Sequence, residues 1–144
     1  MISWPGKVKP RMDKDHLAIN VDLWPTLAGL LKTPLPPGLS GINLTDERAV
    51  AKRQRLFGEQ YAHNIADVDA PTRSLQNRWI IDGWWKLVAP DSRHRTDGQA
   101  ELYDLSKDPW EKDDLARKET GRVKQLRQQL DAWWNPGASE SGAK

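Results

Sequence analysis

The residue types that enzymes use for catalysis are sparse in this 144-residue chain. Its three histidines, His16, His63 and His94, are scattered, and no spacing of Ser, His and Asp suggests a catalytic triad. No glycine-rich phosphate loop occurs, and the absence of cysteine excludes disulfides and thiolate metal sites. The sequence therefore predicts no catalytic residue in this chain.

One short segment carries the residue types of a metal site. Asp13, Asp15 and His16 stand close together, and carboxylates and imidazoles are common metal ligands. A solvated loop before a helix explains the segment more simply, because motifs this short often match by chance. We therefore predict no metal-binding residue here.

Three residues are candidates for contacts with an anionic ligand. Arg73 holds its charge at every relevant pH, and its planar fork can bind a sulfate or carboxylate through two bonds. Glu59 and His63 stand where a predicted strand leaves the sheet, and loops at such places carry binding groups. The alternatives stay open: Glu59 and His63 are then ordinary exposed polar residues, and Arg73 forms a structural salt bridge with Asp67, Asp69 or Asp82.

A basic segment near the C-terminus is a weaker candidate for binding a polyanion. Its cations are Arg117, Lys118, Arg122, Lys124 and Arg127. A solvated helix face is the simpler interpretation of this segment. The formal net charge of +2 also argues against a nucleic-acid-binding domain.

The candidate residues need a sheet to position them, and the chain contains a strong hairpin signal. The apolar runs at residues 74–81 and 84–89 are joined by Asp82-Gly83. An Asp-Gly pair tolerates the positive φ angles of a tight two-residue turn. This turn would pair Ile80 with Trp85.

Three helices are expected beside the strands. Residues 22–32 place their leucines on one face, with Asp22 as the cap of the first turn. Residues 45–53 form a shorter helix with Thr45 as its cap. Residues 120–134 form the last helix, with apolar side chains along one face.

Together these elements predict an α+β fold, a small antiparallel β-sheet packed against a C-terminal helix. Residues 55–61 and 101–105 are further strands, and Asp108 and Glu111 stand at the spacing of a capping box. Five of the eight tryptophans fall in the hairpin and the last helix, and we expect them to form one core. These five are Trp79, Trp84, Trp85, Trp133 and Trp134.

The composition agrees with a globular domain. Hydrophobic residues make up 38% of the chain and charged residues 29%, and 144 residues suffice for one domain with a real core. The chain shows no secretory signal and no apolar run of membrane-spanning length.

Several segments together resemble the C-terminal portion of the sulfatases, in the alkaline-phosphatase-like superfamily. These segments fall in the family's order over residues 2–134 and read ISWPGKVKP, VDLWPTLAGLL, PTRSLQNRWIIDGWWKLV, ELYDLSKDPWEKDDL and LRQQLDAWW. The string PTRSLQNR is most similar to the branch that acts on N-sulfated or O-sulfated sugars, the N-sulfoglucosamine sulfohydrolase-like branch. In that branch an arginine matches Arg73.

The resemblance implies that the catalytic parts of the enzyme lie outside this sequence. The family's nucleophile is a formylglycine made from Cys or Ser in a C-x-P-x-R motif, and this chain contains no such motif. The family's metal ligands would precede Ile2, so calcium is expected in the full-length enzyme and not in this chain. By the same resemblance, residues 1–44 are a remnant of the catalytic α/β domain, residues 45–135 the C-terminal subdomain, and residues 136–144 a flexible tail.

The implied role is to brace the missing catalytic domain and to form part of the rim around a sulfated sugar. Full-length family members are often exported, and the N-terminal strand and helix, left uncovered, could pair with another copy. The alternative is a stand-alone binding module for sulfated or acidic glycans. A reading frame that continues upstream through C-x-P-x-R would favour the sulfatase, and a true start at Met1 would favour the module.

Overall fold

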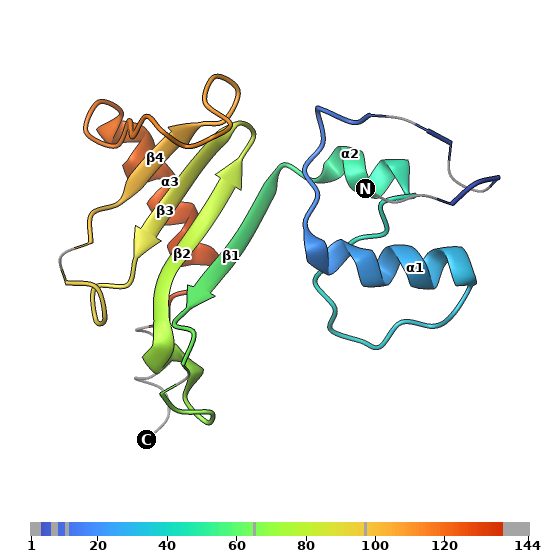
Figure 1. The fold of residues 1–144 in the computed structure, drawn as a ribbon, viewed down its shortest axis with the longest axis horizontal. Coiled ribbons are helices and arrows are strands. Elements are labelled where there is room, and N and C mark those ends of the chain that lie inside the picture. The colour runs from blue at the N-terminus through green and yellow to red at the C-terminus, as the bar shows by residue number, and fades with distance from the viewer. Residues whose placement is uncertain (1–3, 7–8, 11, 65, 97, 137–144) are drawn as a thin grey trace. The chain divides into compact units, whose positions relative to one another are not determined.

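The computed structural model describes residues 4–6, 9–10, 12–64, 66–96 and 98–136. The chain divides into two compact units, residues 1–53 and 54–144 (Figure 1). The strand expected at the start of the chain lies largely outside the described residues. Pro5 and Gly6 form a turn, with Gly6 at φ +78°. No helix within the described ranges is long and apolar enough to cross a membrane.

The first unit contains two helices joined by an irregular loop. A 3-10 turn, η1 (Asn20–Asp22), leads directly into α1 (Leu23–Leu31), and α2 (Glu47–Lys52) follows the loop. α1 and α2 confirm the helices predicted over residues 22–32 and 45–53. α2 lies in the first compact unit, residues 1–53.

The predicted helix caps were wrong in both cases. Asp46, and not Thr45, caps α2, because its side chain accepts hydrogen bonds from the N–H groups of residues 48 and 49. Asp22 precedes α1 without capping it. Its carboxylate is instead fully buried and turned toward other segments of the unit.

The Asp22 carboxylate is the polar centre of the first unit. It accepts hydrogen bonds at 2.9 Å from the N–H of Ile19 and the N–H of Ile42. Both nitrogens at the end of the Arg53 guanidinium also bind it, Nη2 at 2.8 Å from Oδ1. One side chain therefore ties together the start of α1, the irregular loop and the residue after α2.

The apolar side chains of α1 remain exposed in the structure. Leu23, Trp24, Leu27 and Leu31 each keep between 45% and 61% of their surface accessible. The helix buries Pro25, Thr26 and Ala28 against the rest of its unit instead. The predicted leucine face is thus present, but nothing among the described residues of this unit covers it.

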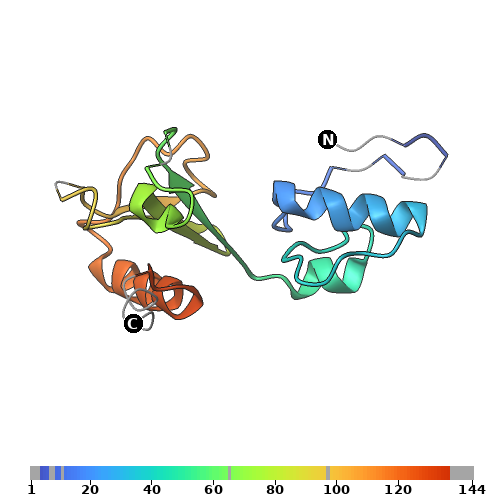
Figure 2. The same ribbon diagram turned by 90° about the horizontal axis from the view of Figure 1, so that it is seen from below.

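The second unit confirms the predicted α+β fold. Its sheet is antiparallel with four strands in the order β1-β2-β3-β4, and the helix α3 (Thr120–Trp133) lies against β2 and β3 (Figures 1 and 2). The strand bounds are Arg55–Tyr61 for β1, Leu75–Asp82 for β2, Trp85–Pro90 for β3 and Glu101–Asp104 for β4. A short 3-10 turn, η2 (Pro71–Ser74), leads into β2.

The hairpin forms as predicted, but its register was predicted wrongly. Asp82 pairs with Trp85 and Ile80 pairs with Leu87, so that the two turn residues are Gly83 and Trp84. Gly83 has φ +58°, and glycine at the first central position is typical of a type II′ turn. Asp82 stays in β2. Its carboxylate accepts a hydrogen bond from Nε of Arg55 in the neighbouring strand β1, at 3.0 Å.

The core lies between α3 and one face of the sheet. Ile80, Leu87 and Leu102 come from adjacent paired positions of β2, β3 and β4. Leu126 and Leu130 of α3 pack against them, and all five are at most 2% exposed. We call this side of the sheet the helix face and the opposite side the open face.

The tryptophans do not form the single core that was expected. Trp85 packs against the aliphatic cluster, and Trp133 stacks on Phe57 with 5.1 Å between ring centroids. Trp79 lies on the open face above Gly58, where a Cβ atom would come within 2.3 Å of the indole. Trp84, at the hairpin tip, is 50% exposed.

Arg78 anchors the C-terminal end of α3 to the sheet. Its guanidinium donates to the carbonyl oxygens of Leu130 and Trp134 and to Asp131 Oδ1, the last at 2.7 Å. Cations stabilise helix C-termini, where carbonyl groups lack partners within the helix. Local sequence patterns did not predict this contact, because its partners lie more than 50 residues away along the chain.

The segment between β4 and α3 covers the outer edge of the sheet. Leu102 N–H donates to Asp114 Oδ1 at 3.0 Å, and Leu115 N–H donates to the Leu102 carbonyl at 2.8 Å. No helix begins at Asp108, so the predicted capping box was wrong, although the Asp108 carboxylate does cap a turn by accepting from the N–H groups of residues 112 and 113. Glu111 instead binds Lys86 Nζ at 2.7 Å.

Candidate functional site

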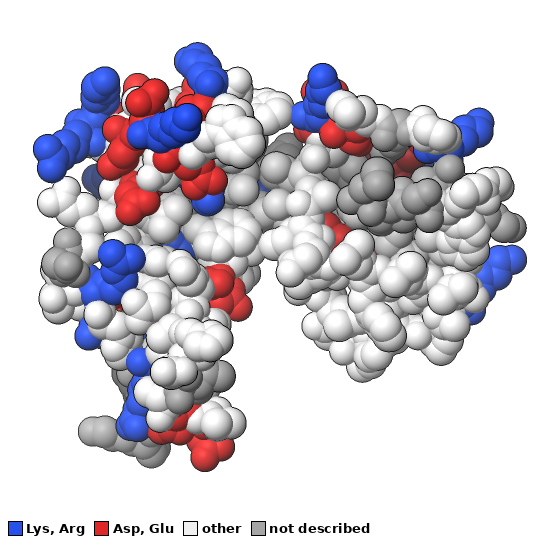
Figure 3. Space-filling view, in the orientation of Figure 1, with Lys and Arg blue, Asp and Glu red and all other residues white. Residues whose placement is uncertain are grey.

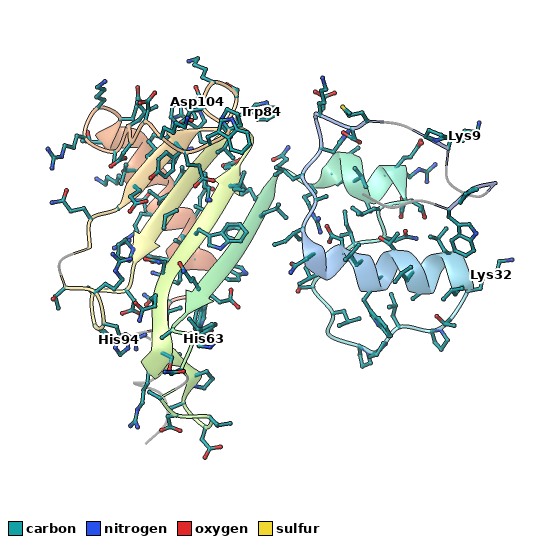
Figure 4. The ribbon with its side chains drawn as sticks, viewed as in Figure 1. Lys9, Lys32, His63, Trp84, His94 and Asp104 are labelled. Carbon is teal, nitrogen blue, oxygen red and sulfur yellow. The ribbon has the colours of Figure 1, made fainter. Side chains whose placement is uncertain are left out.

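The predicted binding residues lie at one end of the sheet in the second unit. β1 ends there, β2 begins there and β3 ends there, so that the loops of residues 62–74 and 91–100 emerge together (Figure 1). Figure 4 labels His63 and His94 at this end. Figure 3 shows basic and acidic side chains mixed over it. We call this region the loop end of the sheet.

Arg73 projects from η2 and forms the ion pair that the structural alternative predicted. Its Nη1 lies 2.8 Å from Asp67 Oδ2, while the arginine side chain remains 66% exposed. Asp67 also accepts hydrogen bonds from the N–H groups of residues 69 and 70. The charge of Arg73 is therefore partly neutralised, although its position remains accessible.

Glu59 and His63 belong to different elements of this region, a strand and a loop. Glu59 lies opposite Arg78 in the β1–β2 register. It stands two residues after Phe57, which stacks on Trp133 of α3, so the side chain of Glu59 is on the helix face. His63 is exposed in the loop after β1. No hydrogen bond or ion pair joins Glu59, His63 and Arg73 within the described part of the chain, so the structure places them at one end without assembling them into a cluster.

A second group at the loop end was not found from the sequence. Asn77 is only 6% exposed, and its Nδ2 donates to Gln60 Oε1 at 2.8 Å. Its Oδ1 accepts a hydrogen bond from Arg95 Nη1 at 3.4 Å. These three residues come from β1, β2 and the loop after β3, so their proximity depends on strand register. Periodicity alone gives no signal for it.

The loop that carries Arg95 is held in place by a buried carboxylate. The Asp91 carboxylate forms an ion pair with Arg93, whose Nη2 lies 2.7 Å from Oδ2. The main-chain carbonyl of Asp91 accepts a hydrogen bond from Arg95 N–H at 2.8 Å. Burial would raise the pKa of Asp91, but the adjacent Arg93 guanidinium more than offsets this effect and holds the pKa below its ordinary value. Arg93 thus serves the loop as a structural ion partner.

The remaining candidates offer no metal site in the described structure. Asp13 binds the N–H groups of residues 15 and 16, and His16 Nδ1 lies 3.0 Å from its Oδ1. Across the described ranges, no group of three or more His, Asp and Glu side chains is arranged to hold a metal ion. The described residues therefore provide no cluster of side-chain ligands for calcium.

The basic residues around α3 have mixed environments. Arg122 lies over the indole of Trp85, with 4.3 Å from the guanidinium carbon to the ring centroid, and a cation in this position is attracted by the ring face. Lys124 is exposed. Arg122 therefore packs on the sheet and does not belong to the solvated helix face that was expected, whereas Lys124 fits that expectation.

Comparison with known proteins identifies the class of this fold. The model of the family "N-sulphoglucosamine sulphohydrolase, C-terminal" matches residues 1–135. An N-acetylgalactosamine-6-O-sulfatase of Bacteroides thetaiotaomicron is 27% identical over 139 residues, which are 92% of this chain and 26% of that protein. The chain therefore spans about a quarter of this relative.

Solved structures show the same fold at low sequence identity. A Bacteroides fragilis protein assigned to the sulfatases, yidJ, aligns with a TM-score of 0.65 at 20% identity, over 93% of this chain and 28% of its own. A protein solved with its substrate D-glucosamine-2-N,6-O-disulfate aligns with a TM-score of 0.55 at 20% identity, over 81% of this chain and 24% of its own.

The matching family model describes a C-terminal region of the sulphohydrolases, and the aligned relatives are about four times as long as this chain. The chain belongs to the N-sulphoglucosamine sulphohydrolase C-terminal family. This confirms the resemblance to the sulfatases on which the sequence analysis relied. Sulfatases of carbohydrates are among its homologues.

Proposed function

We propose that the chain is the C-terminal part of a carbohydrate sulfatase, where it braces the catalytic domain and forms part of the substrate rim. The family match over residues 1–135 is the observation that carries this proposal. The chain itself contributes no nucleophile, because it lacks a cysteine and any motif that could yield formylglycine. Calcium would be held by the catalytic domain, since the described residues offer no ligand cluster.

The proposed substrate is a sulfated amino sugar. Two observations support this class: one relative is an N-acetylgalactosamine-6-O-sulfatase, and a structure of the same fold holds D-glucosamine-2-N,6-O-disulfate. In this chain the rim would consist of the loop end of the sheet. Arg73 and His63 would contribute exposed polar groups there, and Glu59 would contribute a carboxylate from the helix-face side of β1.

The isolated chain is expected to show no sulfatase activity. Sulfate ester hydrolysis needs a nucleophile and a cation that stabilises developing charge, and this chain offers neither. The measurement is hydrolysis of a chromogenic aryl sulfate with and without calcium. Turnover that survives repurification and disappears on substitution of a residue in this chain would overturn the proposal of a non-catalytic part.

The proposed partner of the first unit is the catalytic domain of the same sulfatase. Residues 1–44 would then be a remnant of that domain and residues 45–135 the C-terminal subdomain. The exposed apolar side chains of α1 support this proposal. Monomeric proteins rarely expose contiguous apolar patches without a binding role, so we expect the catalytic domain to cover this face.

In the isolated chain, this same face is expected to promote self-association. Leu27 is 45% exposed within it, so Leu27→Lys should shift the sedimentation profile toward monomer, while Lys52→Gln, on the exposed end of α2, should leave the profile unchanged. Hydrogen exchange in residues 12–32 should be faster than in β2 at low concentration. A parent chain that stays monomeric and uniformly protected at every concentration would refute this proposal.

A further inference from the structure

The three arginines of the loop end differ in how their charge is compensated. Arg73 pairs with Asp67, and Arg93 pairs with Asp91. Arg95 has no carboxylate partner in the described part of the chain, and its side-chain contact is with the neutral amide of Asn77. A cation that is already paired has less to gain from an anionic ligand, so Arg95 is the best placed of the three to bind one.

The contacts of Asn77 fix the direction of the hydrogen bonds around it. Arginine has only donors, so the Asn77 oxygen must face Arg95, at 3.4 Å. The Asn77 nitrogen therefore faces the Gln60 oxygen, at 2.8 Å, and the amide nitrogen of Gln60 points away from Asn77. Gln60 and Arg95, the two outer members of this hydrogen-bonded group, then both present N–H donors.

We call the N–H groups of Gln60 and Arg95 the donor edge. Hydrogen-bond donors of this kind suit a ligand group that has only acceptors. Sulfate and carboxylate oxygens accept hydrogen bonds, and charge-assisted bonds from arginine are about twice as strong as neutral ones. The contact of Arg95 with Asn77 is long, so most of its donor capacity remains available.

The backbone around this donor edge is held in position before any ligand binds. Asn77 lies within β2 and is nearly fully buried, and Arg95 N–H donates to the Asp91 carbonyl at 2.8 Å. Trp79 follows Asn77 on the open face of β2 and rests above Gly58. Trp79 thus places an apolar ring on the same face of the sheet as Asn77.

We propose that Arg95, together with Gln60, binds an anionic oxygen group of the sugar substrate, a sulfate or the carboxylate of an acidic sugar. This proposal rests on the proposed function and assigns the charge contact at the rim to Arg95 in place of Arg73. Asn77 is a positioning residue, since it acts by holding both donors. The charge contact with the substrate would then lie on the open-face side of the loop end.

The test is a titration of the chain followed by amide resonances of Gln60 and Asn77. The ligands are N-acetylgalactosamine 6-sulfate, glucuronic acid and unsulfated N-acetylgalactosamine. The parent chain should show saturable shifts with an anionic sugar only, and Arg95→Gln should weaken this binding by about tenfold or more. Loss with the sulfated sugar identifies sulfate as the bound group, and loss with glucuronic acid identifies carboxylate.

Three further variants make the result specific. Gln60→Glu replaces a donor by a negative charge on an exposed strand position and should also weaken binding. Lys107→Gln removes one positive charge from an 84% exposed side chain near β4 and should leave binding unchanged. Arg73→Gln should have a smaller effect than Arg95→Gln, because Asp67 already neutralises Arg73 in part. Melting temperatures of all variants should match the parent.

Two outcomes would overturn the proposal, and they are distinguishable. If the parent binds and Arg95→Gln binds equally well while Arg73→Gln does not, the Arg95 assignment fails and the rim function stands. If the parent shows no saturable shift with either anionic sugar, both the Arg95 assignment and the proposed rim function fail.

Discussion

Replacing Asp22 by Asn is expected to destabilise the first unit by about 3–5 kcal/mol, the typical effect of removing one partner of a buried ion pair. Asp22 is 0% exposed, and Arg53 keeps only 10% of its side chain accessible. The substitution leaves the arginine charge buried without a counterion. It also weakens the acceptor for the N–H groups of Ile19 and Ile42, which fix the irregular loop.

The measurement for Asp22→Asn is hydrogen exchange resolved by unit. Residues 12–53 should lose protection, whereas the strands of the second unit should keep theirs. The matched control is Asp82→Asn, which removes an acid from the exposed Arg55–Asp82 pair and should cost at most about 1 kcal/mol. Similar losses in the two variants would contradict the central role of Asp22.

The Asp22 interaction also predicts the direction of a pH effect. Burial would raise the pKa of Asp22, but Arg53 and the N–H groups of Ile42 and Ile19 outweigh it and hold the pKa below its ordinary value of 3.8. A lowered folded-state pKa means that the stabilisation is present above the ordinary value and is lost as pH falls through the folded pKa. Asp22→Asn should remove this part of the acid sensitivity of residues 12–53.

Leu130→Ala is expected to cost the second unit about 2–5 kcal/mol, the usual range for truncating a buried leucine. Leu130 is 0% exposed and packs with Ile80, Leu87 and Leu102 between α3 and the sheet. The substitution removes apolar contact and leaves a cavity that the strands can fill only in part. A melting temperature lower by more than about 8 °C is expected for a unit of this size.

The control for Leu130→Ala lies on the same helix. Gln128 is exposed on α3, so Gln128→Ala should change the free energy of unfolding by less than about 0.5 kcal/mol. Thermal unfolding followed by circular dichroism compares the two variants with the parent. If Leu130→Ala melts within a degree or two of the parent, the core described between α3 and the sheet is wrong.

Local sequence patterns predicted the elements of the fold well. The run RLFGEQY gave a strand with the same bounds as β1, and apolar periodicity gave the last helix within one residue of its observed end. These successes have a common cause, because strand and helix patterns depend on burial along a single segment. The exposed leucines of α1 also followed from periodicity, although periodicity could not say what covers them.

Interactions between segments were harder to predict. The Asp-Gly signal located the hairpin but shifted its register, because Gly83 alone meets the positive φ requirement when it occupies the first turn position. Asp82 then remains available to Arg55 of β1. Asp22 and Arg78 were missed for the same reason, since their partners lie 20 or more residues away in sequence.

The candidate site shows the same division. Arg73 was found because its residue type and its position after Pro71 are visible in the sequence, and its ion pair with Asp67 was one of the stated alternatives. Arg95 was missed because its significance comes from Asn77 and from the lack of a carboxylate, which only the folded loop reveals. Charge compensation is a property of the structure and not of the sequence pattern.

The mass of the native polypeptide that contains this chain tests the central claim most directly. Antibodies against the second unit would capture it from its source for intact-mass analysis and peptide mapping. Because this chain covers 26% of the N-acetylgalactosamine-6-O-sulfatase relative, we expect a polypeptide about four times as long, with a formylglycine motif upstream of Ile2. A native protein of 16.4 kDa that begins at Met1 would contradict the sulfatase account and support a stand-alone glycan-binding module.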